Sequence, residues 1–240
     1  MAILYIVATP IGNLQDITLR ALETLKAVDF IICEDTRLTK RLLDHHQINR
    51  PTISFHQHSS GEKTSYIIGQ LTRGQQAAFV SDAGTPGVSD PGNQLVAAAV
   101  NAGITVVPIP GPSALTAALS VAGIATDSFL FLGFLPHKKG RQTLLRSIDT
   151  EPRVVVLYES SHRIIKLLGS LAELMPDRTV VVGRELTKIH EEFFRGTAAG
   201  AFEYFSAGEQ RGEFVVIMEK LKSKNQKSKF RYSAGGGMVN

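Results

Sequence analysis

The stretch Val-Ser-Asp-Ala-Gly-Thr-Pro-Gly-Val-Ser-Asp-Pro-Gly at 80–92 constrains the fold of this chain more than any other. It follows the apolar run at 77–80, which is typical of a strand buried in a parallel sheet. Its glycines, prolines and aspartates exclude regular structure and predict a sharply bent loop. A helix is expected next, with Asp90 as its N-cap and Pro91 at its first position. Since ligands of open α/β sheets bind outside the carboxyl ends of the strands, the loop is a candidate binding site, although a plain β-to-α connection would also use these residues.

The first half of the chain alternates strand and helix patterns, which predicts a mostly parallel sheet with helices on both faces. Apolar and β-branched runs predict strands at 3–7, 30–33, 52–55, 77–80 and 105–108. Amphipathic patterns predict helices at 19–28, 38–46, 64–71 and 94–101. A Pro-Gly-Pro break precedes a further Ala/Leu-rich helix after Ser113, and we place the end of an N-terminal α/β domain, 1–115, at this helix.

The second half again alternates strands and helices, at shorter spacings, which predicts a mixed sheet in a C-terminal α/β domain at 116–221. The expected strands are 129–134, 153–158, 179–182 and 214–218, and the expected helices are 143–148, 164–174 and 198–205. Residues 222–240 are rich in Lys and Ser and have no apolar periodicity, so they are predicted to form a disordered basic tail.

Charge and composition exclude several classes of protein. The net charge is +4, but six of the 26 basic residues and none of the 22 acidic ones fall from Lys220 onward. The rest of the chain is slightly acidic, so any nucleic-acid contact there must come from local patches. No apolar run approaches the about 18 residues of a membrane span, and the start lacks the basic region of a signal peptide. Cys33 is the only cysteine, which excludes internal disulfides and predicts a small core residue in a cytoplasmic protein.

Four loops that follow predicted strands are rich in Gly, Pro and small polar residues, at 8–13, 80–92, 109–114 and 133–136. They predict a pocket built mainly from backbone, because glycines let the main chain approach a ligand closely. Such a pocket suits a ligand with an adenine edge, ribose hydroxyls and an amino-acid end. Two roles fit Asp82: accepting a hydrogen bond from an ammonium or hydroxyl group of the ligand, or forming an Asx turn that holds its own loop. No dinucleotide or Walker-type phosphate motif is present.

Seven motifs, in order, carry a resemblance to a known family. Four lie in the first half of the chain: Thr-Pro-Ile-Gly-Asn at 9–13, Glu-Asp-Thr-Arg at 34–37, Ser-Asp-Ala-Gly-Thr-Pro at 81–86 and Pro-Gly-Pro-Ser-Ala at 110–114. Three lie in the second half: Gly-Phe-Leu-Pro at 133–136, Tyr-Glu-Ser-Ser-His-Arg at 158–163 and Arg-Glu-Leu-Thr-Lys at 184–188. Over residues 1 to about 219 the chain resembles the ribosomal RNA small subunit methyltransferase I family, in the tetrapyrrole-methylase (class III) superfamily. The resemblance implies two α/β domains, a homodimer, and S-adenosylmethionine bound in the cleft between the domains. It also implies 2′-O-methylation of a cytidine ribose at the decoding centre of 16S rRNA, in the small ribosomal subunit.

The resemblance also assigns the cofactor contacts. From the N-terminal domain it implies Pro10, Gly12, Asp82, Ala83, Gly84, Thr85, Ser113 and Ala114. From the C-terminal domain it implies Glu159, Leu186, Gly212 and Glu213.

The candidates for the general base that a ribose hydroxyl requires lie at or near predicted strand ends: Glu34, Asp35, Glu159, Glu185 and Lys188. Glu34 and Asp35 are favoured, since Glu159 is also an implied cofactor contact and a lysine is normally charged. Glu34 and Asp35 directly follow the strand that ends at Cys33, so they lie at the same sheet edge as the pocket loops. Acidic residues before a helix also serve as caps, and the sequence leaves both roles open. No third ligand accompanies His56 and His58, so no metal site is predicted.

Basic residues near the predicted loops are candidates for RNA phosphate contacts. The densest patch, at 137–141, directly follows a pocket loop. The candidates are Arg37, Lys138, Lys139, Arg141 and Arg163. Two other functions stay open. The first is methylation of a tetrapyrrole, and the basic patch at 138–141 and the ordered motifs argue against it. The second is RNA binding without catalysis, and the four pocket loops argue against it.

Overall fold

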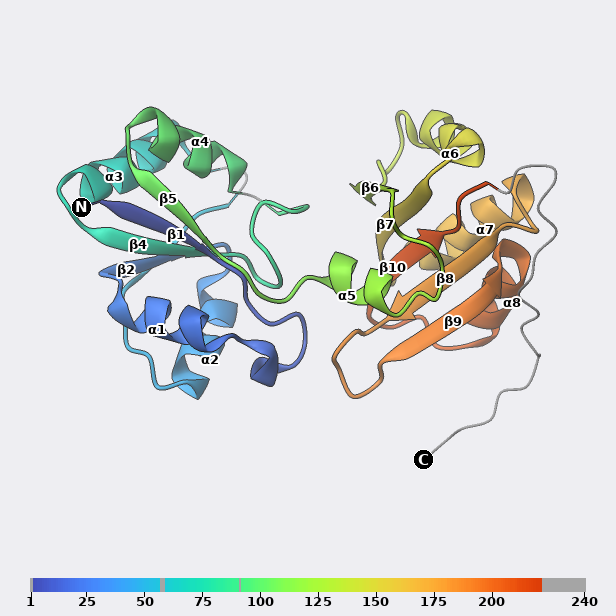
Figure 1. Ribbon diagram of the computed structural model, residues 1–240, viewed down its shortest axis with the longest axis horizontal. Helices are drawn as coiled ribbons and strands as arrows, with labels where there is room; N and C mark the ends of the chain where they lie inside the picture. Colours follow the sequence, from blue (N-terminus) through green and yellow to red (C-terminus); the bar gives the residue numbers. More distant parts are fainter. Residues whose placement is uncertain (1, 57–58, 91, 222–240) are drawn as a thin grey trace. The chain divides into compact units, whose positions relative to one another are not determined.

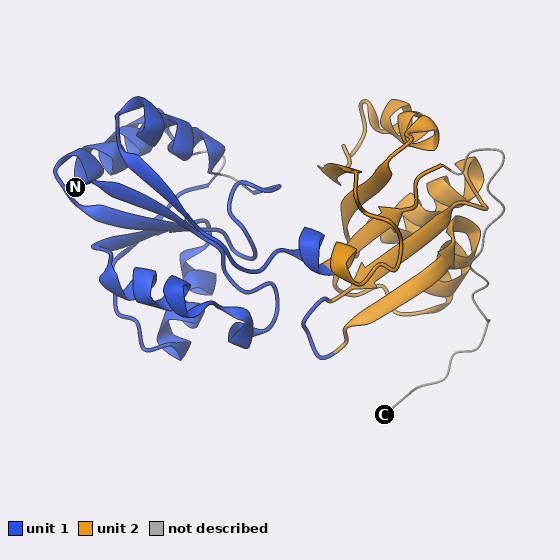
Figure 2. Cartoon of the chain, viewed as in Figure 1, with its two compact units in different colours: residues 1–117, 186–189 blue, residues 118–185, 190–240 orange. Residues whose placement is uncertain are grey.

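The computed structural model describes residues 2–56, 59–90 and 92–221, in which the chain forms two α/β units (Figures 1 and 2). Unit 1 runs to Ala117 and also includes the loop Leu186–Ile189, whereas unit 2 holds Ala118–Glu185 and the described residues from His190 onward. The predicted tail at 222–240, together with His58 and Pro91, lies outside the described residues. Within the described part of the chain, no helix is long and apolar enough to cross a membrane.

Unit 1 contains a five-stranded sheet with the order β3-β2-β4-β1-β5, and every neighbouring pair is parallel. Its strands are β1 (Ile3–Val7), β2 (Phe30–Cys33), β3 (Thr52–Ser54), β4 (Gln76–Val80) and β5 (Thr105–Ile109). Because all five strands run the same way, the loops that follow them share one edge of the sheet. The predicted parallel-rich sheet is confirmed.

Four helices cover the two faces of this sheet (Figure 1). Helices α1 (Leu19–Ala27) and α2 (Thr36–His45) bury their apolar sides on one face, where Cys33 lies in the core as predicted. Helices α3 (Gly61–Thr72) and α4 (Asn93–Asn101) bury theirs on the other face. The chain leaves β1 toward β2 and leaves β4 toward β5, in opposite directions along the sheet. The neighbouring ends of β1 and β4 therefore form the switch point where open α/β sheets bind ligands.

The start of α4 differs from the sequence prediction. Its N-cap is Gly92, with φ of +135° and no side-chain cap, and not Asp90. A Cβ on Gly92 would lie 2.3 Å from Cε1 of Phe79, so a glycine is needed where the chain turns over the core. The carboxyl of Asp90 is hydrogen-bonded to the Ser81 side chain instead.

Unit 2 contains the predicted mixed sheet, with the order β6-β7-β10-β8-β9 and a single parallel pair, β6 with β7. Its strands are β6 (Phe129–Phe134), β7 (Val154–Ser160), β8 (Thr179–Arg184), β9 (Glu192–Thr197) and β10 (Glu213–Met218). Helices α6 (Arg141–Thr150), α7 (Ile164–Leu174) and α8 (Ala198–Ala207) share one core with the sheet. The helix α5 (Ala114–Ser120) carries the chain from unit 1 into unit 2.

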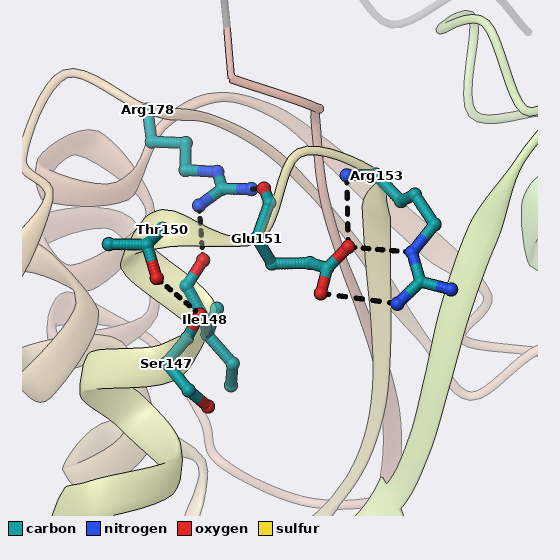
Figure 3. A network of polar contacts seen from close by, with 6 residues as sticks. All are labelled: Ser147, Ile148, Thr150, Glu151, Arg153 and Arg178. Carbon is teal, nitrogen blue, oxygen red and sulfur yellow. Dashed lines mark hydrogen bonds and ion pairs between the residues drawn. The ribbon is translucent and has the colours of Figure 1, made fainter.

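Arg178, just before β8, connects the end of α6 to the residue that follows β10. Its guanidinium donates to the carbonyl oxygens of Ile148 at 2.6 Å and Glu151 at 3.3 Å (Figure 3). It also donates to the carbonyl oxygen of Glu219 at 2.8 Å. Burial lowers the pKa of Arg178 from its ordinary value, and the side chain stays charged because arginine is so strongly basic. One arginine thus joins the carboxyl end of α6 to the segment that follows β10.

Replacing Arg178 by Ala is expected to lower the free energy of unfolding by about 2–3 kcal/mol, because hydrogen bonds from a charged donor are lost and carbonyls stay buried. Arg153→Ala is the control, since Arg153 pairs with Glu151 at the surface and its removal should cost less than about 1 kcal/mol. Urea unfolding followed by circular dichroism measures both variants. Equal losses would show that Arg178 does not brace unit 2.

Candidate functional site

Three of the predicted loops are hydrogen-bonded together at the carboxyl edge of the unit 1 sheet. Thr9 and Gly84 exchange backbone hydrogen bonds of 2.9 and 3.0 Å. The Thr9 hydroxyl donates to the Ser81 carbonyl at 3.2 Å, and the Thr85 hydroxyl donates to the Pro112 carbonyl at 3.1 Å. The loops after β1, β4 and β5 are therefore one connected surface. The fourth predicted loop, 133–136, belongs to unit 2.

Gly84 has a structural role in the site. Its φ is +78°, a conformation that favours glycine. Both its N–H and its C=O bond to Thr9, so Gly84 closes the pair of loops. Its contact with the cofactor stays a prediction.

A pocket of about 310 Å³ opens in unit 1 between the loop after β1, the helix α2 and the end of β4. Both polar and apolar side chains line it. The lining residues are Thr9, Pro10, Gly12, Leu14, Leu38, Thr39, Arg41, Leu42, Val80, Ser81 and Asp82. Of the predicted cofactor contacts in this unit, Pro10, Gly12 and Asp82 line the pocket, whereas Ala83, Gly84, Thr85, Ser113 and Ala114 do not. The sequence prediction missed the wall that α2 supplies, although Leu38, Thr39, Arg41 and Leu42 have the spacing of one helical face.

Asp82 connects the central loop to the start of α2. Its Oδ1 accepts a hydrogen bond of 2.9 Å from the backbone N–H of Asp35. Its Oδ2 makes no hydrogen bond with any described residue, and the side chain is exposed. One oxygen therefore holds the loop while the other is available to a ligand.

Asp35 and Glu34 have opposite electrostatic environments. Asp35 is the N-cap of α2: it accepts from the Arg37 N–H at 2.8 Å and pairs with the Arg37 guanidinium at 2.7 Å. These hydrogen bonds lower the pKa of Asp35 to about 2, which makes it a poor proton acceptor. Burial raises the pKa of Glu34 above its ordinary value, and the neighbouring charges of Asp82 and Asp90 add to the rise. Of the two predicted catalytic carboxylates, Glu34 has the better properties for a general base.

Asp90 is a carboxylate that the sequence prediction assigned only to a helix cap. Burial raises its pKa to about 6, and the Asp82 charge adds to this while the Ser81 hydroxyl opposes it. The sheet edge thus gathers several acidic groups, at least one of which exchanges its proton near neutral pH. Among the described residues no group of three side chains is suited to hold a metal ion.

The loop Leu186–Ile189 packs against the loop after β1 inside unit 1. The Thr187 hydroxyl accepts from the Asn13 N–H at 3.1 Å. A Cβ on Gly12 would lie 2.4 Å from Cγ of Lys188 and 3.0 Å from the Leu186 carbonyl, so only glycine allows this approach. The predicted cofactor residues Gly12 and Leu186 are thereby brought together.

Three of the predicted contact residues of unit 2 are engaged with one another. The Glu159 carboxylate is fully buried and pairs with Arg163 at 2.7 Å and with Arg141 at 3.7 Å. Arg141 is only 4% exposed, so the cofactor contact of Glu159 and the RNA contact of Arg141 stay predictions that this packing does not favour. The Arg163 guanidinium also donates to the Leu135 carbonyl at 2.9 Å, so it too is held inside the unit. Gly140 is the N-cap of α6 and has a left-handed conformation, with φ of +83°. Arg141 is the first residue of α6, and its side chain is buried in unit 2.

The remaining predicted residues of unit 2 lie at its surface. Lys138 and Lys139 are exposed. The Glu213 N–H bonds to Oε1 of Glu185 at 3.1 Å beside Gly212, whose φ is +101°. A Cβ on Gly212 would lie 2.4 Å from the Glu185 side chain, which explains the glycine in this turn.

Comparison with known proteins assigns this fold and these loops to a family. The family model described as tetrapyrrole (corrin/porphyrin) methylases matches residues 3–201. The chain belongs to this family. Similar proteins named ribosomal RNA small subunit methyltransferase I include that of Synechocystis, 51% identical over 91% of this chain and 79% of its own. That of Thermotoga maritima is 46% identical over 91% of this chain and 98% of its own.

Solved structures agree on the architecture of this methylase. A cobalt precorrin-4 methyltransferase superposes with a TM-score of 0.69 at 16% identity and covers 91% of this chain and 95% of its own. Diphthine synthase superposes with a TM-score of 0.71 at 13% identity over 90% of each chain. At such identities these structures establish the fold alone.

S-adenosylmethionine is the methyl donor of this family. The sheet edge of unit 1 suits it, because the free Oδ2 of Asp82 can accept from the ammonium or a ribose hydroxyl. The pocket wall at Pro10 and Val80 offers apolar surface beside that oxygen. When bound, the cofactor supplies an electrophilic methyl group on a positively charged sulfur.

Gly84→Val is expected to abolish binding of S-adenosylmethionine in titration calorimetry, because it breaks the bridge to Thr9 that aligns the loops. Gly103→Val is the matched control: its φ of +71° imposes a similar backbone cost of about 1–2 kcal/mol, and no atom lies within 4 Å of its Cβ position. The two variants should lose similar stability, and only Gly84→Val should lose the cofactor. Normal affinity in a folded Gly84→Val protein would contradict this role.

Proposed function

We propose that this methylase transfers a methyl group from S-adenosylmethionine to the ribose 2′-hydroxyl of a decoding-centre cytidine in 16S rRNA. The observation that carries the proposal is the similarity to relatives named ribosomal RNA small subunit methyltransferase I, at 43–51% identity over at least 90% of the chain. The tetrapyrrole alternative rests on the description of the family model and on solved tetrapyrrole methylases only 15–18% identical, a level at which fold and substrate are not linked.

The chemistry of a ribose hydroxyl explains what the site must provide. The hydroxyl is a weak acid, and its developing negative charge is neutralised as it approaches a positive sulfur. Most of the acceleration can then come from alignment of the reacting atoms, which contributes up to about 7–11 kcal/mol. A general base adds a factor of about 10²–10⁴. Glu34, with its raised pKa at the sheet edge, is the residue we assign to this role.

RNA contacts are assigned to the basic side chains that remain at the surface. Lys138 and Lys139 are exposed and available to phosphates. Arg37 is also exposed, with 89% of its side chain accessible, although one face of its guanidinium is paired with Asp35. The assembly of two copies, which the family resemblance implies, remains a prediction.

The direct test is methyl transfer from labelled S-adenosylmethionine to small ribosomal subunits from cells that lack this modification, followed by nucleoside mapping. A single 2′-O-methylcytidine in the decoding region is the expected product. Label on a base, on another nucleotide or on a porphyrin in place of the RNA would overturn the proposal.

Glu34→Gln is expected to lower kcat about 10²–10⁴-fold with little change in KM, because glutamine cannot accept the proton but has nearly the same size and shape as glutamate. Since the base acts deprotonated, the wild-type rate should fall as pH drops through the raised pKa of Glu34, and the variant should lose this dependence. Asp35→Asn is the control, because asparagine is an equally good N-cap and the same charge is removed one residue away. Equal losses of kcat in both variants would exclude Glu34 as the specific base.

A further inference from the structure

The α2 wall of the unit 1 pocket has a composition that the cofactor assignment does not use. Leu38, Thr39, Arg41 and Leu42 line one side of a pocket of about 310 Å³. Of the residues that the family resemblance assigns to S-adenosylmethionine, Pro10, Gly12 and Asp82 line the same pocket, whereas 83–85 and 113–114 do not. The α2 side of the pocket is therefore free of residues assigned to the cofactor.

Arg41 is the basic residue of this wall. It is exposed and forms no ion pair or hydrogen bond with any described residue, whereas Arg37, one turn earlier, is paired with Asp35. A guanidinium beside a pocket with both polar and apolar walls is suited to bind a phosphate, since its planar donors match two phosphate oxygens.

The pocket is also lined by Asp82, whose Oδ2 makes no hydrogen bond with the described residues. Because this oxygen suits the ammonium or a ribose hydroxyl of the cofactor, a nucleotide on the α2 side would lie beside the cofactor. Through its Oδ1, Asp82 is bonded to the backbone of Asp35, so the pocket adjoins the chain segment that contains Glu34.

We propose that the α2 side of this pocket holds the target nucleotide, with a phosphate on Arg41 and apolar contacts to Leu38 and Leu42. The assignment rests on the proposed function, and it places the nucleotide in the pocket that Asp82 lines, beside the chain segment that begins α2. It explains why an amphipathic helix leaves a leucine 43% exposed, at Leu38, beside a free arginine. Nucleotides bind such mixed surfaces through apolar contact of the ring and ionic contact of the phosphate.

The first test compares Arg41→Gln with Lys40→Gln. Lys40 is an exposed neighbour on the same helix and does not line the pocket, so both variants lose one positive charge and the same general attraction for RNA. Arg41→Gln is expected to raise KM for small subunits about tenfold, and Lys40→Gln less than about twofold. Titration of S-adenosylmethionine should give wild-type affinity for both.

A second variant, Leu38→Trp, fills the pocket from its rim, where the exposed position tolerates a larger side chain. It should weaken RNA binding by a similar factor while the melting temperature and the cofactor affinity stay unchanged. Equal KM values for Arg41→Gln and Lys40→Gln, or unaltered RNA binding by Leu38→Trp, would overturn the pocket assignment. Loss of cofactor affinity with normal RNA binding would assign the pocket to S-adenosylmethionine instead. These outcomes differ from failure of the proposed function, in which the wild-type protein itself would not methylate the subunit.

Discussion

The two hydrogen bonds between Thr9 and Gly84 hold the site of unit 1 together. In a parallel sheet, the loops that follow the strands all lie at the carboxyl edge. The loops after β1 and β4, however, lead in opposite directions along the sheet and would diverge without hydrogen bonds between them. The bridge closes this divergence at the switch point, and the hydroxyls of Thr9 and Thr85 extend it to Ser81 and Pro112. A surface assembled mainly from backbone needs such contacts, because few side chains are present to fix its shape.

Electrostatics at this edge follow from the same arrangement. Burial raises the pKa of both Glu34 and Asp90, and the negative charge of Asp82 adds to the rise in each. The pKa of Asp35 is lowered instead, because the Arg37 side chain and backbone hydrogen-bond to its carboxylate. Neighbouring carboxylates thus differ in basicity through burial and hydrogen bonding, which separates a capping residue from a candidate base.

Much of this fold could be predicted from the sequence, since strands such as Ile3–Val7 and helices such as Ile164–Leu174 carry clear periodicity. The strand β9 was missed because its residues, Glu-Phe-Phe-Arg-Gly-Thr, alternate poorly and lie half-buried at a sheet edge. The site was predicted less completely. The position of Gly84 in a loop does not reveal that its backbone N–H and C=O both bond to Thr9. A run of basic residues does not reveal that the Arg141 side chain is buried in unit 2. The family and the fold class are confirmed, whereas the contact residues stay predictions, because a sequence pattern does not show which side chains packing and hydrogen bonding engage.

The loop Leu186–Ile189 has a consequence for how the chain can be divided. It lies between β8 and β9, two strands of unit 2, yet it is part of unit 1 and covers Gly12. The polypeptide therefore passes between the units three times, at 117/118, 185/186 and 189/190. A fragment that ended at Ala117 would contain the whole parallel sheet but would lack the segment packed on its first loop. Each unit is made of two separate chain segments, so recombination could not exchange either unit as one continuous piece of sequence. Substitutions in the loop Leu186–Ile189 must therefore preserve its packing in unit 1 although its neighbours in sequence belong to unit 2.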